Sequence, residues 1–196
     1  MPIKLQKQII AGILDAHEAA FRASFTPENI KLLEQMAEEI TNAFKRGNKI
    51  MLCGNGGSAA DAQHIAAEFI GRFKRERKSL PAIALTTDTS ILTALANDYS
   101  YETIFSRQIE GLAQEGDILI ALSTSGTSKN VIEAVRKAKE MGLTIIGFTG
   151  KSGGELKKLS NFNFAAGSQK TPNVQEMHIT ALHAISEAVE DALFPA

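Results

Sequence analysis

The sequence predicts an α/β protein built on a doubly wound, five-stranded parallel sheet, with a helical extension at its N-terminus. Two observations lead to this class. From residue 48 onward, short apolar runs alternate with segments of helical periodicity, as in parallel strands joined by helices. Residues 1–47 hold two amphipathic helical patterns and no strand pattern. We therefore expect a single domain over 1–196, in which the extension, 1–47, precedes an α/β core, 48–196.

The N-terminal segment is expected to form two long helices. Apolar residues recur at helical spacing through the first helix, 4–24, in which His17 is interpreted as structural. Thr26 and Pro27 predict the start of the second helix, a Thr cap followed by Pro, and this helix should run to about Phe44. Together the two helices carry more apolar surface than one sheet face needs. We therefore expect part of that surface to pack against another subunit of a homo-oligomer.

The core pattern predicts five strands and the helices between them. The strands are expected at 49–53, 82–85, 118–121, 143–149 and, more weakly, 162–165. The helices are expected at 59–73, from 89 to about 96, at 102–113, 131–140 and 173–193. The stretch 97–100 should break the second of these helices, and 150–154 should form a flexible turn.

Charge, cysteine content and hydropathy exclude several function classes. The chain has 21 Lys and Arg against 22 Asp and Glu, a net charge of −1, so no global basic field indicates nucleic acid. The local basic run at 72–78 is interpreted as a solvated helix end. A single cysteine, Cys53, excludes an intrachain disulfide. No apolar run approaches the length of a membrane span, and the first residues lack an apolar leader segment, so we expect a cytoplasmic protein without a membrane partner.

A loop rich in serine and threonine is the first candidate binding site. Ser123, Thr124, Ser125 and Ser128 follow a predicted strand and precede a predicted helix. Loops at the carboxyl ends of parallel strands bind ligands, and the free amides of a helix N-terminus favour phosphate. Ordinary turn and cap chemistry explains the same composition, so both interpretations stay open. The glycine loop at 54–58 fits neither a dinucleotide fingerprint nor a Walker A motif.

Two helices carry side chains that could bind a metal or move protons. His64 and Glu68 are four residues apart and so share one face of a helix, with Asp61 on the same side. Gln175 and His183 are eight residues apart, about 80° around a helix. Imidazole, carboxylate and amide oxygen together would suit zinc or a similar divalent ion. A surface ion pair on the first helix and a core histidine on the second are the alternatives.

Four motifs resemble the sugar isomerase (SIS) family, and within it the phosphoheptose isomerases, over nearly the whole chain. They are Leu-Cys-Gly-Asn-Gly-Gly-Ser at 52–58, Asp-Ala-Gln-His at 61–64, Ser-Thr-Ser-Gly at 123–126 and Gln-Glu-Met-His at 175–178. The resemblance implies a flavodoxin-like sheet and a homotetramer with active sites between subunits. It implies one zinc ion per subunit, bound by His64, Glu68, Gln175 and His183. The substrate contacts it implies are Asn55, Gly56, Gly57, Ser58, Glu68, Arg72, Asn97, Asp98, Ser123, Thr124, Ser125, Ser128 and Gln175.

The resemblance also implies a reaction. Members of this family convert sedoheptulose 7-phosphate, a phosphorylated seven-carbon sugar, to glycero-manno-heptose 7-phosphate through an enediol, which begins heptose synthesis for lipopolysaccharide. By resemblance Glu68 is the base and His183 the acid. A residue bound to zinc carries protons poorly, so either the ligation loosens during turnover or the metal mainly orders the site. One departure is that 171–174 reads Thr-Pro-Asn-Val, where the family usually carries an Arg.

Two other functions remain as alternatives. The sequences at 75–85 and at Leu193-Phe194-Pro195 resemble those of a non-catalytic SIS protein that binds the bacterial replication initiator. A sugar-phosphate-sensing module would keep the serine loop without needing Glu68 or His183. The initiator-binding protein that these segments resemble is expected to lack residues that match Glu68 and His183. Their presence here favours the enzyme.

Overall fold

Five parallel strands form one sheet in the computed structural model, which describes the backbone of residues 3–195 and the side chains of residues 8–195. The strands are β1 (Ile50–Cys53), β2 (Ala82–Ala84), β3 (Ile118–Ser123), β4 (Thr144–Thr149) and β5 (Phe162–Ala165). Their order is β2-β1-β3-β4-β5, the flavodoxin-like arrangement. The predicted fold class is confirmed. Residues 1, 2 and 196 of the expected domain lie outside the described range.

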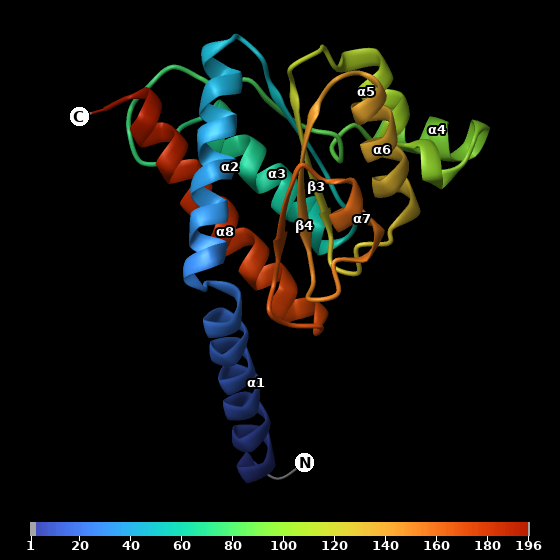
Figure 1. Ribbon diagram of the computed structural model, residues 1–196. Helices are drawn as coiled ribbons and strands as arrows, with labels where there is room; N and C mark the ends of the chain where they lie inside the picture. The colour runs from blue at the N-terminus through green and yellow to red at the C-terminus, as the bar shows by residue number, and fades with distance from the viewer. Residues whose placement is uncertain (1–2, 196) are drawn as a thin grey trace.

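Helices cover both faces of this sheet (Figure 1). They are α1 (Ile3–Ser24), α2 (Pro27–Lys45), α3 (Gly57–Ile70), α4 (Thr89–Asp98), α5 (Ser106–Leu112), α6 (Lys129–Glu140), α7 (Gly154–Leu159) and α8 (Thr171–Leu193), with a 3-10 turn η1 (Tyr101–Thr103). Side chains alternate along each strand, so Ile50 and Leu52 pack with α2, α3 and α8, whereas Met51 and Cys53 pack with α5, α6 and α7. The buried core therefore has two layers, one on each side of the sheet.

The N-terminal helices differ in how they join the core. Thr26 caps α2 as predicted, since its hydroxyl accepts the Asn29 N–H at 3.3 Å. Helix α2 packs on α8, whereas most of α1 projects from the body (Figure 1). The end of α1 is fastened by Ser24, whose hydroxyl donates to the Ala20 carbonyl and accepts the Gly167 N–H. Within residues 3–195, no helix has the length and apolar character needed to cross a membrane.

Several predicted boundaries are wrong in the structure. Helix α4 continues through Asn97 and Asp98, which were expected to break it. The helix expected at 102–113 is divided into η1 and α5, because Ile104 and Phe105 both turn into the core between them. Helix α7 begins at Gly154, at the end of the expected flexible turn, and was not predicted at all. Its six residues are too few to show a helical period in the sequence.

The basic run at 72–78 is also not a helix end. Helix α3 stops at Ile70, three residues earlier than expected, because Gly71 follows it and the chain then leaves the helical conformation. The Arg77 side chain is only 1% exposed and pairs with Glu190, so one member of the run is buried rather than solvated.

A buried carboxylate holds the start of β3. Asp117 accepts hydrogen bonds from the Lys49 N–H at 3.0 Å and the Gln114 N–H at 2.8 Å, and it pairs with the Lys49 ammonium. Burial alone would raise the pKa of Asp117, but the bonds from Lys49, Gln114 and the Asn48 amide outweigh it and hold this pKa below its ordinary value. The contact ties the beginnings of β1 and β3 together at the edge opposite the ligand-binding loops.

Replacing this carboxylate should destabilise the protein in a pH-dependent way. We expect Asp117→Asn to lower the free energy of unfolding by about 1–3 kcal/mol at pH 7. Because the folded pKa lies below the unfolded one, the carboxylate contributes fully above about pH 4, and this contribution is lost as the pH falls further. Urea unfolding at pH 7 and pH 3 measures it, with the exposed Asp15→Asn as control. An equal difference at both pH values would contradict the assignment.

Candidate active site

Two loops meet at the carboxyl edge of the sheet where the strand order reverses. They follow β1 and β3, which are neighbours, and this is the position at which open α/β sheets bind ligands. Asn55 and Asn130 join the loops through two hydrogen bonds of 2.8 Å, each amide donating to the oxygen of the other. The Tyr101 hydroxyl donates to the same Asn55 oxygen at 3.0 Å. Asn55, which was predicted to contact substrate, therefore has a structural role in the structure: it connects the loop after β1 to α6 and η1.

The serine loop forms its own hydrogen-bond network. Ser123 is the last residue of β3. Its hydroxyl accepts the Gly126 N–H at 3.1 Å and lies 2.9 Å from the Ser128 hydroxyl. The Ser125 hydroxyl accepts from both the N–H and the hydroxyl of Thr127. Ser128 is the cap residue of α6 but its side chain makes no capping bond. The loop thus presents hydroxyls beside a helix N-terminus that favours an anion.

Gly126 lets this loop approach its neighbour closely. Its φ is +71°, in the left-handed region that favours glycine, and a Cβ there would lie 2.2 Å from the Gly153 carbonyl oxygen. The Leu156 N–H of α7 donates to the Gly126 carbonyl, and the Gly150 N–H donates to that of Thr124. The loop after β4 therefore supports the serine loop from behind.

Three side chains from α3 and α8 converge about two to three turns beyond the start of α3. The His64 Nε2 atom lies 3.1 Å from Glu68 Oε1 on the next turn of α3 and 3.0 Å from His183 Nε2 on α8. One donor atom from each of the three residues lies within 4.8 Å of the other two. The shared helix face of His64 and Glu68 was predicted from their spacing. Their meeting with His183 depends on the packing of α3 against α8.

The chemistry of these three groups fits a divalent metal ion. Burial first, and then the neighbouring His64, lower the pKa of His183, although Glu68 opposes them. A lowered pKa favours the neutral imidazole, which is the form that binds metals. Tetrahedral zinc with ligands at about 2.1 Å places neighbouring ligand atoms about 3.4 Å apart. The observed separations of 3.0 and 3.1 Å are close to that value.

Gln175 lies nearer the start of α8 than His183, its predicted partner on the same helix. It precedes His183 by about two turns. Its amide packs against the start of α3, where a Cβ on Gly57 would lie 2.4 Å from the Gln175 Nε2 atom. A Cβ at position 57 would displace the flexible end of this side chain, so glycine leaves room for the Gln175 amide beside the glycine loop. Its role as a metal ligand stays a prediction.

The other predicted contacts occupy several elements. Gly56 and the nearly buried Ser58 lie at the start of α3, and Arg72 lies in the exposed chain after it. Asn97 and Asp98 end α4, where the Asn97 amide donates to the Asp98 carboxylate at 2.8 Å. Helix α4 contacts η1 and buries none of its residues, so the structure does not bring this pair to His64, Glu68 and His183.

Asp61 adds a group that titrates near neutrality. It lies one turn before His64 on α3, and one of its carboxylate oxygens is buried without a hydrogen-bond partner. Burial raises the pKa of Asp61 to about 6, although the nearby His64 opposes the shift. Buried, unpaired carboxyls of this kind concentrate at functional sites.

Sequence reasoning missed further residues around the site. His17 was expected to be structural and without a partner, but its Nδ1 atom lies 2.6 Å from Glu176 of α8. Asn173, in the segment where the family usually carries an Arg, is buried and donates to the same Glu176 carboxylate at 3.2 Å. Tyr101 and Asn130 were not predicted to hold Asn55, nor was the Phe73 ring predicted beside His183. Apart from Asn173 and Glu176, which are three residues apart on α8, none of these contacts follows a local spacing.

Known proteins match this arrangement closely. The SIS domain family model matches residues 16–150. A phosphoheptose isomerase of Campylobacter concisus is 49% identical over 189 residues, which cover 95% of this chain and 97% of the relative. The chain belongs to the phosphoheptose isomerase family. Solved structures of family members agree: that from Neisseria gonorrhoeae is 39% identical with a TM-score of 0.85, covering 95% of this chain and 99% of that one. The structure from Francisella tularensis is 32% identical with a TM-score of 0.89, covering 97% of this chain and 100% of that one.

The close backbone approach at Gly126 gives a test of the loop geometry. We expect Gly126→Ala to destabilise the protein by at least about 1–2 kcal/mol, because alanine resists a positive φ and its methyl group overlaps the Gly153 carbonyl. The control is Gly111→Ala in α5, where a Cβ has nothing within 4 Å and alanine should stabilise the helix slightly. Urea denaturation compares the variants. Equal midpoints for Gly126→Ala and wild type would show that the loop does not need its left-handed turn.

Proposed function

We propose that this protein converts sedoheptulose 7-phosphate to glycero-manno-heptose 7-phosphate, the first step of heptose precursor synthesis. Family membership makes the chain an aldose–ketose isomerase, and relatives named phosphoheptose isomerase match it over nearly their full length. The observation that carries the proposal is the convergence of His64, Glu68 and His183 in one cluster, in a fold that also has a hydroxyl-rich loop at the N-terminus of α6. The first group can move protons, and the loop can hold a phosphate.

The reaction needs a base and an acid on one side of the sugar. A base removes a proton from the carbon next to the carbonyl, and an acid protonates the carbonyl oxygen, which gives an enediol. Return of a proton to the former carbonyl carbon, with loss of the proton from the neighbouring hydroxyl, forms the new carbonyl and completes the isomerisation. We assign the base to Glu68 and the acid to His183, two groups that lie within reach of the same small substrate unit. Asp61 can also gain or release a proton near neutral pH, because its pKa is raised to about 6.

We propose one zinc ion per subunit, held by His64, Glu68 and His183, with Gln175 as the fourth ligand. The three clustered donors, two nitrogens and one carboxylate oxygen, support this set. When bound, zinc supplies a Lewis acid that polarises a carbonyl oxygen. The residues themselves orient the carboxylate and the imidazole toward one point.

The phosphate is assigned to the serine loop. Ser123, Thr124, Ser125 and Ser128 would donate hydroxyls, and the first amides of α6 would add main-chain donors. The remaining predicted contacts, Asn55, Gly56, Gly57, Ser58, Arg72, Asn97, Asp98 and Gln175, are proposed for the sugar chain. The neutral hydroxyl lining suits a small sugar phosphate better than a long polyanion.

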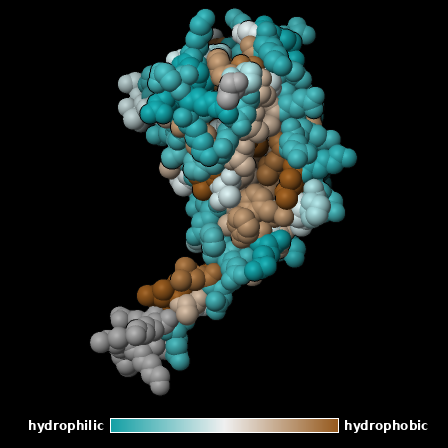
Figure 2. Space-filling model, turned by 90° about the vertical axis from the view of Figure 1, so that its left-hand side faces the viewer, coloured by the Kyte–Doolittle hydropathy of each residue, from teal (hydrophilic) through white to brown (hydrophobic). Residues whose placement is uncertain are grey.

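We further propose that the protein is a homo-oligomer, a homotetramer by resemblance to its family. Helix α1 leaves Ile10, Ile13 and Leu14 exposed, the last at 63%. Figure 2 shows this apolar surface on the projecting helix, with more in a hollow of the body above it. Apolar surface on a projecting helix favours burial against a partner.

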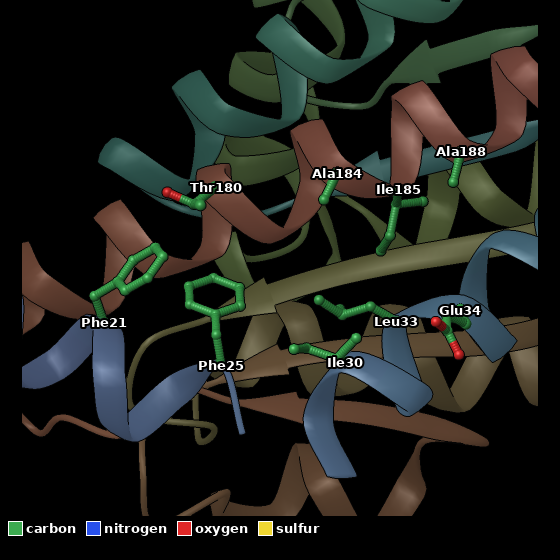
Figure 3. Close-up of a pocket in the computed structure, with 9 residues that line it drawn as sticks. All are labelled: Phe21, Phe25, Ile30, Leu33, Glu34, Thr180, Ala184, Ile185 and Ala188. Atoms are coloured by element: carbon green, nitrogen blue, oxygen red, sulfur yellow. The ribbon is translucent and has the colours of Figure 1, made fainter. Parts of the chain in front are cut away.

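A groove lies at the base of the projecting helix. It has a volume of about 380 Å³ and is lined by Phe21 of α1, by Phe25, by Leu33 of α2 and by Ile185 of α8, all of which point into it (Figure 3). The groove has no catalytic group near it, and its lining is almost wholly apolar. It supports contact between subunits rather than substrate binding.

The alternatives receive less support. A protein that only binds the replication initiator, or only senses a sugar phosphate, needs neither Glu68 nor His183. Here both side chains converge on His64 in one cluster, and their geometry suits proton transfer and metal binding.

Turnover should depend on the Glu68 carboxylate. We expect Glu68→Gln to lower kcat on sedoheptulose 7-phosphate by about 10²- to 10⁴-fold, since the amide cannot accept the proton. Chelation should inactivate the wild type, and added zinc should restore it. The control is Glu140→Gln, an exposed residue of α6 that pairs with Lys137. The isomerase assignment would be wrong if the folded, zinc-loaded wild type bound the sugar phosphate without converting it. That result would favour a sensing or initiator-binding function.

The exposed face of α1 should be needed for assembly. We expect Leu14→Asp to weaken subunit association at least about tenfold, because a charge replaces an apolar side chain at the contact. The matched control is Ile91→Asp, which changes an exposed isoleucine of α4 instead. Sedimentation velocity at several protein concentrations measures the effect. Identical masses for wild type and Leu14→Asp would remove α1 from the interface.

A further inference from the structure

The main chain of the segment after α3 is bonded to one carboxylate of α8, while the side chains of Lys74 and Arg75 pair with two others, Glu187 and Asp191. We call residues 71–78 the strap. The Glu190 side chain, 1% exposed, accepts the main-chain N–H groups of Phe73 at 3.0 Å, Lys74 at 2.7 Å and Arg75 at 3.0 Å. It also accepts from Arg77 Nε at 2.7 Å. One side chain of α8 thus fixes the course of a chain segment that has no regular structure of its own.

Arg77 links the strap back to the metal-binding helix. Its terminal nitrogens donate to the carbonyls of Glu68 at 2.8 Å and Phe69 at 2.9 Å, in the last turn of α3. Carbonyls at a helix end lack partners within the helix, and the planar guanidinium supplies them here. The backbone of Glu68, whose side chain is the proposed base, is therefore bonded directly to the buried ion pair.

The strap also places an aromatic ring against the proposed acid. The Phe73 ring stacks on His183, with centroids 5.6 Å apart and planes at 27°. The His183 ring also contacts the His64 ring, whose centroid lies 5.0 Å away. Phe73 thus limits the rotation of the His183 ring about its side chain while the Nε2 atom faces His64.

We propose that Glu190 and Arg77 are positioning residues for the isomerisation, which act on Glu68 through its backbone and on His183 through Phe73. The inference rests on the proposed roles of Glu68 and His183. The pair is fully ionised under working conditions: burial would raise the pKa of Glu190, but the four donors outweigh it and hold this pKa at about 2. The strap is therefore fixed by charge-assisted hydrogen bonds rather than by apolar burial.

Phe73 offers the sharpest test, because it is only half-buried and its loss leaves the Glu190 bonds in place. We expect Phe73→Leu to shift the His183 ring resonances of the metal-free protein and to leave those of His178 unchanged. Zinc affinity and kcat should each fall about 10- to 100-fold, as for other groups that orient metal ligands, with KM little changed. Phe73→Tyr keeps the ring and should restore all three readouts. The control is Phe162→Leu, on β5.

The carboxylate is tested by Glu190→Gln, which keeps the size but turns an amide N–H toward main-chain donors. Because the strap also carries Arg72, this variant should raise KM as well as lower kcat. Arg77→Lys should behave alike, since an ammonium cannot reach both carbonyls and Glu190. If either variant fails to fold, the Phe73 pair decides alone. Unchanged His183 resonances and zinc affinity in Phe73→Leu would overturn the proposal. An inactive wild type would instead contradict the proposed isomerase function. The His183 resonances of the metal-free protein would still test whether the strap positions this ring.

Discussion

The packing of α3 against α8 is the constraint on which the site depends. Residue numbers rise together along the contact: Gly57 lies against Gln175, His64 against His183, and the strap after α3 against Glu190. The two helices therefore run side by side in the same direction on one face of the sheet. Glycine at position 57 leaves room for the Gln175 amide, which a Cβ would displace. Close packing there brings the two histidines within reach of each other farther along the helices.

The sheet supplies the second half of the site through its topology. Because β1 and β3 are neighbours, the glycine loop and the serine loop open side by side, and the Asn55–Asn130 pair locks their separation. In the proposed assignment, the phosphate end and the reacting end of the substrate are therefore positioned by different parts of the fold. Strand order fixes the first, and helix packing fixes the second.

Local periodicity explains what the sequence could predict. The strand alternation, the Thr26 cap and the shared face of His64 and Glu68 each depend on residues a few positions apart, and each is present in the structure. His17 and Glu176 are 159 residues apart, Arg77 and Glu190 are 113, and Asn55 and Asn130 are 75. No spacing rule connects such pairs. The basic run misled for the same reason: its buried partner belongs to a helix more than a hundred residues later.

The ionic strap gives the chain after α3 a resistance to acid that apolar packing does not provide. Its carboxylate has a pKa of about 2, so the stabilisation it provides is complete above the ordinary glutamate value near 4 and is lost only below it. The four donors on Glu190 therefore stay bonded in mild acid. The course of the segment between α3 and β2 is thus independent of pH over the range in which most proteins work.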